Sequence, residues 1–432
     1  MHIFFSGVGG TGIGPLALIA HQAGYQVSGS DKQESQYIDY LRKHGVTNIH
    51  IGQTESALAE VHQKNPIDWY VYSSAVLKEN PEHPELLFTK ANHIKTTKRD
   101  EFLNHLLEEK SLKLIAVAGT HGKSTTTAMT IWLMQQLGIP LSYSVGAKIS
   151  FGEMGHFDPA SEYFVYECDE FDRNFLAFHP HTSLITGITW DHHEIFPTEE
   201  NYQQAFKDFI AQSGRTFLWR FEAERLQYHN DSTHTILEDH AEELDKILLN
   251  GLVNRQNAWQ VISAVHYLSG EPLERLFALM NEFPGLSRRM ERLRENLYSD
   301  YAHTPEKIVG ALGVALDIAK SKNQKLVAIY EPLTNRRMHY MRDQHRDIFK
   351  PVSALYWVPS YLAREDPAQH ILTPSELIQS LDPEVQQKTK PMELNDELKQ
   401  IIASHLAQND MVVAFSGGGG HSLDEWLRAE FA

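Results

Sequence analysis

The sequence predicts an α/β protein of three domains, each built around a mostly parallel sheet. Its 432 residues exceed what one hydrophobic core ordinarily serves, and domains of roughly 100 to 200 residues would divide the chain into about three. Short β-rich runs alternate with helical patterns, which is typical of parallel strands joined by crossover helices. A polar stretch before residue 99 and a Pro-Gly pair after Phe283 place the domains at 1–98, 99–283 and 284–432.

Strand-like runs are expected in each domain. In the first domain they are His2–Phe5, Gln26–Gly29 and Trp69–Tyr72, and 95–100 is expected to be a polar break. In the second they are Lys113–Val117, Tyr163–Glu167 and Ser183–Thr189, with a helix over about 124–137. The acid- and histidine-rich segment 222–249 is expected to be a peripheral loop and helix with a solvated face. In the third domain they are Lys325–Tyr330, Ala354–Val358 and Met411–Phe415.

Composition excludes several classes of protein. The single cysteine, Cys168, rules out an intramolecular disulfide framework. The sequence has no run of about 18 apolar residues, so membrane insertion is not expected. The apolar start, Met1–Phe5, runs into a glycine-rich turn and is expected to be a buried strand. A formal net charge of −17 opposes nucleic-acid binding, although a few arginines and backbone amides can still govern a pocket for a small anion. We expect a cytoplasmic protein.

A phosphate-binding loop is the strongest functional signal. It comprises Gly119, Thr120, His121, Gly122, Lys123 and Ser124. The loop lies between a predicted strand and a predicted helix, where backbone amides and the helix N-terminus can hold a polyphosphate. An exposed Lys123 would reach the β and γ phosphates, and the Ser124 hydroxyl would bind Mg²⁺. The full eight-residue Walker pattern is not met, because Val117 stands at its first glycine.

A second glycine-rich turn, Gly7–Gly14, follows the first strand. Asp31 ends the next strand about twenty residues further on, which is the dinucleotide-binding pattern. An NAD-dependent dehydrogenase would show the same turn. It would give no reason for a phosphate loop a hundred residues later.

Both glycine-rich turns resemble those of the Mur ligases. Gly7–Gly14, the first of the two along the chain, resembles the family's GxGGxGxG turn. The phosphate loop, followed by Thr125, resembles the family's ATP loop with serine in place of threonine. The resemblance implies a Rossmann-like UDP-binding first domain, a central P-loop ATPase-like domain and a Rossmann-like C-terminal domain. It also implies that UDP-N-acetylmuramate is bound by Gly9, Gly10, Thr11 and Gly12, with Asp31, Ser73 and Ser74 lining the nucleotide site.

The acidic run Glu167–Asp172 follows a predicted strand, so its carboxylates are expected near the phosphate loop, although a solvated acidic loop is an alternative. It resembles the family motif E-A-D-E-x-D, which implies Glu167 as a Mg²⁺ ligand, and Cys168 is expected to pack. Asp191-His192 resembles a family pair in which the histidine supports a second metal or orients the acceptor. A structural histidine is the alternative for His192. No counterpart of the carbamylated lysine of other branches is present.

Three later elements also resemble the family. Asn254–Ala258 implies that Asn257 contacts adenine, with helix capping as the alternative. Gly285–Glu291 implies that Arg289 clamps the transferred phosphate, with surface ion pairing as the alternative. Asp300–Pro305 implies that Asp300 and His303 complete the nucleotide site. The glycine turn 417–420 is left open between a flexible loop and a substrate contact.

The resemblance implies an ATP-dependent ligase that activates a lactyl carboxylate as an acyl phosphate. A P-loop switch or motor would leave the first turn unused, and a non-catalytic UDP-sugar binding protein would leave Lys123 and Glu167 unused. L-alanine is the favoured acceptor, with Arg337 among its contacts. The tripeptide L-Ala-γ-D-Glu-meso-diaminopimelate stays open, because Glu331-Pro332 and Asn335 resemble the tripeptide-adding branch.

Overall fold

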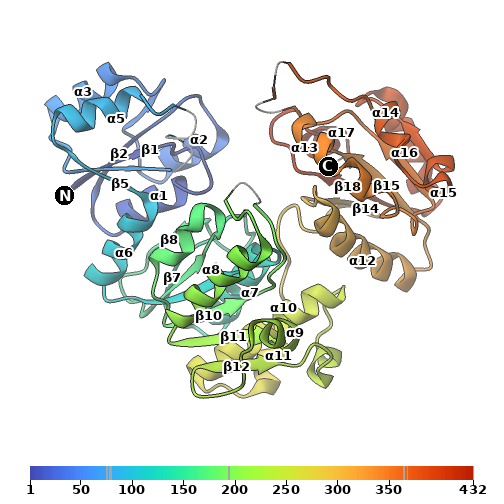
Figure 1. Ribbon diagram of the computed structural model, residues 1–432, viewed down its shortest axis with the longest axis horizontal. Helices are drawn as coiled ribbons and strands as arrows, with labels where there is room; N and C mark the ends of the chain where they lie inside the picture. The colour runs from blue at the N-terminus through green and yellow to red at the C-terminus, as the bar shows by residue number, and fades with distance from the viewer. Residues whose placement is uncertain (74–75, 77–79, 193–194, 363–364, 367, 432) are drawn as a thin grey trace. The chain divides into compact units, whose positions relative to one another are not determined.

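Three separate β-sheets organise the protein (Figure 1), which confirms the predicted α/β class. The computed structural model describes residues 1–432 except 74–75, 77–79, 193–194, 363–364, 367 and 432. Residues 1–247 and 256–283 form one compact unit, which holds the first two sheets. Residues 248–255 and 284–432 form a second unit around the third sheet.

The first sheet has five parallel strands in the order β3-β2-β1-β4-β5. Their bounds are β1 (His2–Ser6), β2 (Gln26–Asp31), β3 (Ile49–Ile51), β4 (Trp69–Tyr72) and β5 (Lys95–Lys98). The expectation of a polar break at 95–100 is wrong, because β5 pairs with β4 as an edge strand. Edge strands tolerate lysine, and the Lys95 ammonium lies 3.3 Å from the centre of the Trp69 ring. The strand order reverses between β1 and β4, beside the glycine turn.

Helices cover both faces of this sheet (Figure 1). Those on one face are α1 (Gly14–Gln22), α2 (Gln36–Lys43) and α6 (Arg99–Glu109), and those on the other are α3 (Glu55–Lys64) and α5 (Pro84–Ala91). Helix α1 is buried almost all round, because it also packs against the second sheet. There, a Cβ on Gly155 would lie 2.5 Å from the Pro15 carbonyl oxygen.

The second sheet has seven strands in the order β12-β11-β10-β6-β9-β7-β8. Their bounds are β6 (Lys113–Ala118), β7 (Leu141–Ser144), β8 (Gly155–His156), β9 (Tyr163–Glu167), β10 (Thr182–Ile185), β11 (Arg215–Trp219) and β12 (His234–Leu237). All neighbours are parallel except β7 and β8. The expectation of only loop and helix over 222–249 is wrong, because β12 extends the sheet there. Only Ile236 and Leu237 of this strand are buried, too short an apolar run to stand out.

The helices of the second sheet also lie in two groups. One group comprises α7 (Lys123–Gln136), α10 (Leu252–Ser269) and α11 (Leu273–Met280); Trp132 of α7 donates to the Leu279 carbonyl, and Trp259 stacks on Phe277. Helix α8 (Glu199–Ala211) shares the hydrophobic core of α6, and Phe206 and Phe209 are fully buried there. Helix α9 spans Arg220–Leu226.

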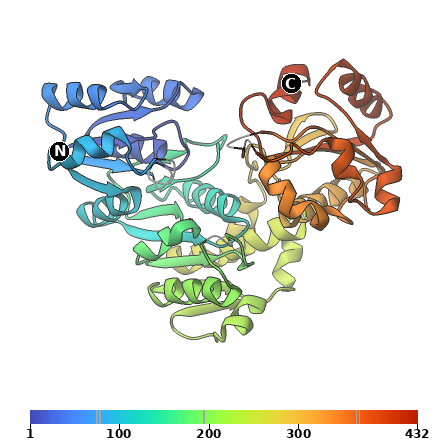
Figure 2. The ribbon, with the colours of Figure 1, turned by 45° about the horizontal axis from the view of Figure 1, so that its top comes forward.

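The third sheet has six strands in the order β13-β14-β18-β15-β16-β17, and only β13 is antiparallel to its neighbour. Their bounds are β13 (Glu291–Arg294), β14 (Leu297–Asp300), β15 (Leu326–Glu331), β16 (Ala354–Trp357), β17 (Thr389–Pro391) and β18 (Met411–Ser416). One face packs on α12 (Pro305–Ser321), α13 (Asn335–Met341), α14 (Pro374–Ile378) and α15 (Pro383–Gln387), and the other on α16 (Asp396–Ala407) and α17 (Leu423–Phe431) (Figure 2). The three central strands end together at Asp300, Ser416 and Glu331.

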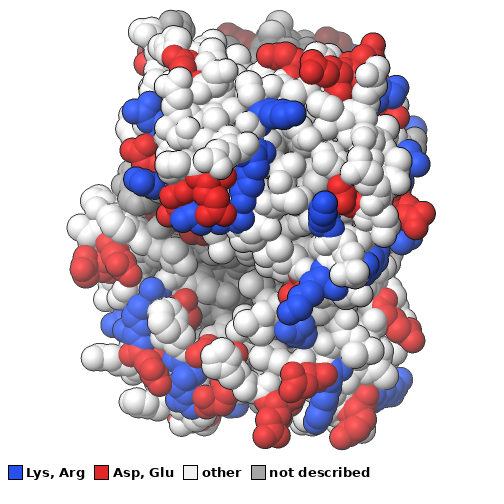
Figure 3. Space-filling model, turned by 90° about the vertical axis from the view of Figure 1, so that its right-hand side faces the viewer, with Lys and Arg blue, Asp and Glu red and all other residues white. Residues whose placement is uncertain are grey.

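In the part of the chain that the structure describes, no helix has both the length and the apolar character needed to cross a bilayer. On the face drawn in Figure 3, basic and acidic side chains of the described residues are interspersed among uncharged ones.

Candidate active site

The phosphate loop connects β6 to α7, and its conformation requires glycine at two positions. Gly119 and Gly122 have φ angles of 141° and 77°, which L side chains rarely adopt. A Cβ on Gly119 would lie 2.3 Å from Thr186 Oγ1, and one on Gly122 would lie 3.0 Å from Asn257 Oδ1. No side chain caps the N-terminus of α7. Its first amides are therefore available to an anion.

Thr120 and His121 anchor this loop to the segment after β10. The Thr120 amide donates to the Gly187 carbonyl at 2.8 Å, and the Thr120 hydroxyl lies 2.7 Å from both the Thr189 carbonyl oxygen and the Tyr202 hydroxyl. Thr186 Oγ1 donates to the His121 carbonyl. The strand predicted over Ser183–Thr189 therefore ends at Ile185, and the rest supports the loop. No local motif in the sequence singled out Thr186 or Tyr202.

Lys123 is not the exposed loop residue expected from the sequence. It is the first residue of α7, its side chain is only 15% exposed, and its ammonium lies 2.6 Å from Glu170 Oε2 and 2.7 Å from the Gly119 carbonyl oxygen. Burial acts to lower the pKa of Lys123, but Glu170 and the neighbouring carboxylates outweigh burial and raise this pKa overall. The ammonium therefore stays charged beside the loop.

Glu170 is a site residue that the sequence motif did not predict, because the motif assigns a role to Glu167, the first glutamate of the acidic run. Its side chain is 1% exposed. Besides Lys123 it accepts a hydrogen bond from the Tyr202 hydroxyl at 3.5 Å. It fixes the position of Lys123 from beneath the loop.

Glu167 and Ser124 form the oxygen pair expected for a cation. Ser124 Oγ donates to Glu167 Oε1 at 2.9 Å, and the Gly146 amide donates to Glu167 Oε2 at 3.0 Å. Carboxylate and hydroxyl oxygens are the hard donors that Mg²⁺ prefers, and Mg²⁺ usually keeps several waters and phosphate oxygens besides one or two carboxylates. The pair therefore fits a phosphate-bound Mg²⁺. Across the described residues, no three His, Cys, Asp or Glu side chains are grouped to hold a metal without such added ligands.

His192 lies beside Glu170. Its Nε2 is 3.8 Å from Glu170 Oε1, and its ring meets the Phe171 ring edge to face at 5.0 Å. Asp172, Arg173 and His192 all have φ between 54° and 58°. Such left-handed conformations in non-glycine residues are strained and cluster at functional sites. The neighbouring His193 lies outside the described residues.

Cys168 and Asn257 have clear positions around the phosphate loop. Cys168 is fully buried, and burial raises the pKa of its thiol, in agreement with a packing role. Asn257 lies inside α10, which begins at Leu252, so helix capping does not explain it. Its side chain is buried and touches Gly122. Thr125 is half-buried in the first turn of α7.

The N-terminal glycine turn is closed by its own strand neighbours. The amides of Gly7 and Val8 both donate to the Ser30 carbonyl, and the Gly9 amide donates to Asp31 Oδ2 at 2.7 Å. Gly10 and Thr11 are exposed. Asp31 therefore shapes the turn, whose tip remains open to a ligand. Ser73 follows β4 and is half-buried, and Ser74 lies outside the described residues.

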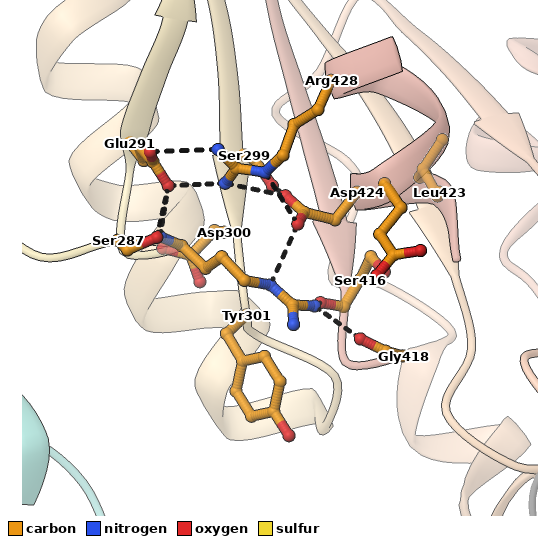
Figure 4. Close-up of polar contacts among 12 residues, drawn as sticks. Ser287, Glu291, Ser299, Asp300, Tyr301, Ser416, Gly418, Leu423, Asp424 and Arg428 are labelled. Carbon is orange, nitrogen blue, oxygen red and sulfur yellow. Dashed lines mark hydrogen bonds and ion pairs between the residues drawn. The ribbon is translucent and has the colours of Figure 1, made fainter. Parts of the chain in front are cut away.

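Two adjacent arginines precede β13 and have different partners; Figure 4 shows the polar cluster that surrounds the first of them. Arg288 donates from Nη2 to the carbonyls of Ser416 and Gly418, at 2.8 Å each, and its Nε lies 3.4 Å from Asp424 Oδ2. The Arg289 side chain makes no hydrogen bond or ion pair among the described residues, and its guanidinium carbon lies 5.3 Å from the centre of the Tyr301 ring. Arg288 is thus a structural residue, while Arg289 has donors available for a ligand.

Asp300 and His303 lie at the end of β14. Asp300 is buried and accepts hydrogen bonds from the amides of Met290 and Ala302, at 2.8 Å each, so it holds the turn in place. His303 lies over Gly417, where a Cβ would lie 2.7 Å from its ring. Glycine is therefore required at 417 by packing, and the turn 417–420 supports both His303 and Arg288.

The pKa of His303 is lowered to about 3. Burial is the largest cause, and the charges of Lys307, Arg337 and Arg289 act in the same direction, against the hydrogen bond to the Tyr301 carbonyl. Arg337 itself is exposed on α13. The edge of the third sheet therefore presents a neutral histidine within a positive field, which suits an anionic ligand.

A phosphate loop with a buried lysine, an oxygen pair for a cation and separate anion-binding edges define an enzyme that uses a nucleoside triphosphate. A model described as Mur ligase family, catalytic domain, matches residues 2–111, and one described as Mur ligase middle domain matches residues 117–229. The UDP-N-acetylmuramate–L-alanine ligase of Salinispora arenicola is 30% identical over 80% of this chain and 72% of its own length. That of Caldicellulosiruptor bescii is 29% identical over 84% of each chain.

Solved structures show the same fold. The UDP-N-acetylmuramate–alanine ligase of Thermotoga maritima superposes with a TM-score of 0.75 at 22% identity, over 97% of this chain and 96% of that one. A murein peptide ligase of Psychrobacter arcticus gives a TM-score of 0.65 at 23% identity, over the same fractions. The chain belongs to the Mur ligase family and is an ATP-dependent ligase.

Proposed function

We propose that this ligase joins L-alanine to the lactyl carboxylate of UDP-N-acetylmuramate in cytoplasmic peptidoglycan precursor synthesis. The observation that carries the proposal is the paired geometry at the phosphate loop, Lys123 on Glu170 and Ser124 on Glu167, in a chain whose relatives are named UDP-N-acetylmuramate–L-alanine ligases. The first glycine turn supplies a second, separate anion site for the UDP-sugar.

The reaction needs two anions brought together and their charge neutralised. The lactyl carboxylate attacks the γ-phosphorus of ATP, which gives an acyl phosphate and ADP; the amine of L-alanine then attacks the acyl carbon, and inorganic phosphate leaves. Mg²⁺ held by Ser124 and Glu167 would neutralise charge on the β and γ phosphates. Lys123, kept charged by Glu170, would stabilise the transferred phosphoryl group, and Asn257 beside the loop would contact adenine.

The third sheet would supply the remaining contacts. Arg289 has unengaged donors for the transferred phosphate, and Arg337 is exposed beside His303, where it can meet the carboxylate of the acceptor. Burial keeps His303 neutral at physiological pH, so its ring can accept a hydrogen bond without adding positive charge. His192, beside Glu170, would orient the acceptor or support a second cation.

The tripeptide is the second candidate acceptor, and its sequence support is weakened by the structure. Asn335 is fully buried, where its side chain bonds to the His370 carbonyl at 3.0 Å and to the Leu372 amide at 2.8 Å. Glu331 is 3% exposed and accepts from Ser416 Oγ and the Leu423 amide. The residues that suggested the tripeptide therefore hold the fold together and do not face an acceptor.

The test is ADP release with UDP-N-acetylmuramate and either L-alanine or the tripeptide. We expect faster turnover with L-alanine. Product from the tripeptide but not from L-alanine would instead identify the recycling activity. ATP hydrolysis that is independent of the UDP-sugar would indicate a P-loop switch or motor, and UDP-sugar binding without any ADP release would indicate a binding protein.

A further inference from the structure

Arg99 lies directly against the first glycine turn. It is the first residue of α6, immediately after β5, so it emerges at the sheet edge where β1 runs into that turn. A Cβ on Gly12 would lie 2.0 Å from Arg99 Nη1 and 3.2 Å from its Cζ. Gly12 therefore has to lack a side chain for the guanidinium to rest on the turn.

This guanidinium is largely enclosed but poorly satisfied. Its side chain is 20% exposed, and within the described ranges it makes no hydrogen bond. Its one ion pair, to Asp169 Oδ2, is 3.9 Å long. The adjacent Lys98 differs, because its ammonium lies 3.0 Å from Asp172 Oδ2. A planar group with five N–H donors, whose one partner among the described residues is this long ion pair, is suited to a bidentate oxyanion.

We propose that Arg99 binds the diphosphate of the UDP-sugar. The inference rests on the proposed function, since it assigns to the UDP-sugar a side-chain contact beyond those implied for Gly9, Gly10, Thr11 and Gly12. The guanidinium on Gly12 faces the same turn whose tip, Gly10 and Thr11, is exposed. Asp169 is its distant partner until the ligand binds.

The test is titration calorimetry of the full chain with UDP-N-acetylmuramate, UDP and uridine. Arg99→Ala should weaken UDP-N-acetylmuramate and UDP to a similar extent, on the order of 10- to 100-fold, because one charge-assisted, bidentate contact is lost. Uridine, which has no phosphate, and ATP should bind as they do to the unaltered protein. Arg99→Lys should recover only part of the affinity, since lysine keeps the charge but not the fork.

Arg42→Ala is the matched control, because Arg42 lies in α2 of the same domain but pairs with Glu34 at 2.8 Å on the surface. It should leave UDP affinity unchanged. Equal UDP affinity in the Arg99→Ala and unaltered proteins would overturn the inference. So would a loss confined to UDP-N-acetylmuramate, which would place Arg99 on the lactyl carboxylate, or a parallel loss for uridine, which would indicate structural damage. If the unaltered protein does not bind the UDP-sugar, the proposed function fails as well.

Discussion

Replacement of Lys123 by methionine should weaken the fold as well as the chemistry. The ammonium lies 2.6 Å from Glu170 Oε2, and Glu170 is 1% exposed. Removal of the cation leaves a buried carboxylate with a distant Tyr202 hydroxyl, 3.5 Å away, and His192, 3.8 Å away. Breaking a buried pair typically costs 3 to 5 kcal/mol, and because Lys123 is partly exposed we expect about 3 kcal/mol.

Urea unfolding of the ligand-free protein measures this cost. Glu170→Gln in the Lys123→Met background should recover most of the lost free energy of unfolding, because no uncompensated charge remains buried. ADP release should stay abolished in both variants, since neither carries the phosphate-loop ammonium. A Lys123→Met protein as stable as the unaltered one, or free-energy changes that simply add in the double variant, would refute the reasoning.

Two further predictions concern the third sheet. Arg288→Ala should lower the free energy of unfolding of that unit by about 2 kcal/mol, since it removes the guanidinium donor of the Ser416 and Gly418 carbonyls and one of the cationic partners of Asp424. Arg289→Ala should cost less than about 1 kcal/mol but strongly reduce ADP release; the reverse pattern would exchange the two roles. Burial lowers the pKa of His345 to about 4, so its contribution to stability is present above the ordinary pKa near 6.5 and lost as the pH falls towards 4. The free energy of unfolding should therefore fall as the pH is lowered through this window, by up to about 1.4 kcal/mol per pH unit for one proton. His345→Gln should make this slope shallower, and an unchanged slope in that variant would contradict the account.

The fold class was predictable because its signals are local. Apolar runs such as Lys113–Val117 and Met411–Phe415 are long enough to identify buried parallel strands, and they match β6 and β18 within one residue. Strands β5 and β12 were missed for a physical reason. Both are polar or short, and they are strands because a neighbouring strand offers them hydrogen bonds.

The site was predictable only where one segment carries it. The phosphate loop and Glu167 are marked by their own motifs, whereas Thr186 and Tyr202 act through contacts to residues about 65 to 80 positions away, which no local pattern records. In the acidic run, the motif predicts a role for Glu167 alone, but the burial of Glu170 and its short distance to Lys123 show that Glu170 pairs with the lysine. Side-chain direction, which sequence does not give, decides such cases.

The same reasoning explains why similarity at the acceptor segment is a weak guide to specificity. Glu331 and Asn335 match a tripeptide-adding pattern, but their side chains bond to the Ser416 hydroxyl and to backbone groups of their own unit. Glu331 joins the ends of β15 and β18 through Ser416, and Asn335 bonds to the backbone of His370 and Leu372. Arg337, two residues after Asn335, is exposed, and its side chain is not part of these buried contacts. Differences in acceptor choice should therefore be sought among exposed residues of α13, where a substitution changes the ligand contact without removing a buried hydrogen bond.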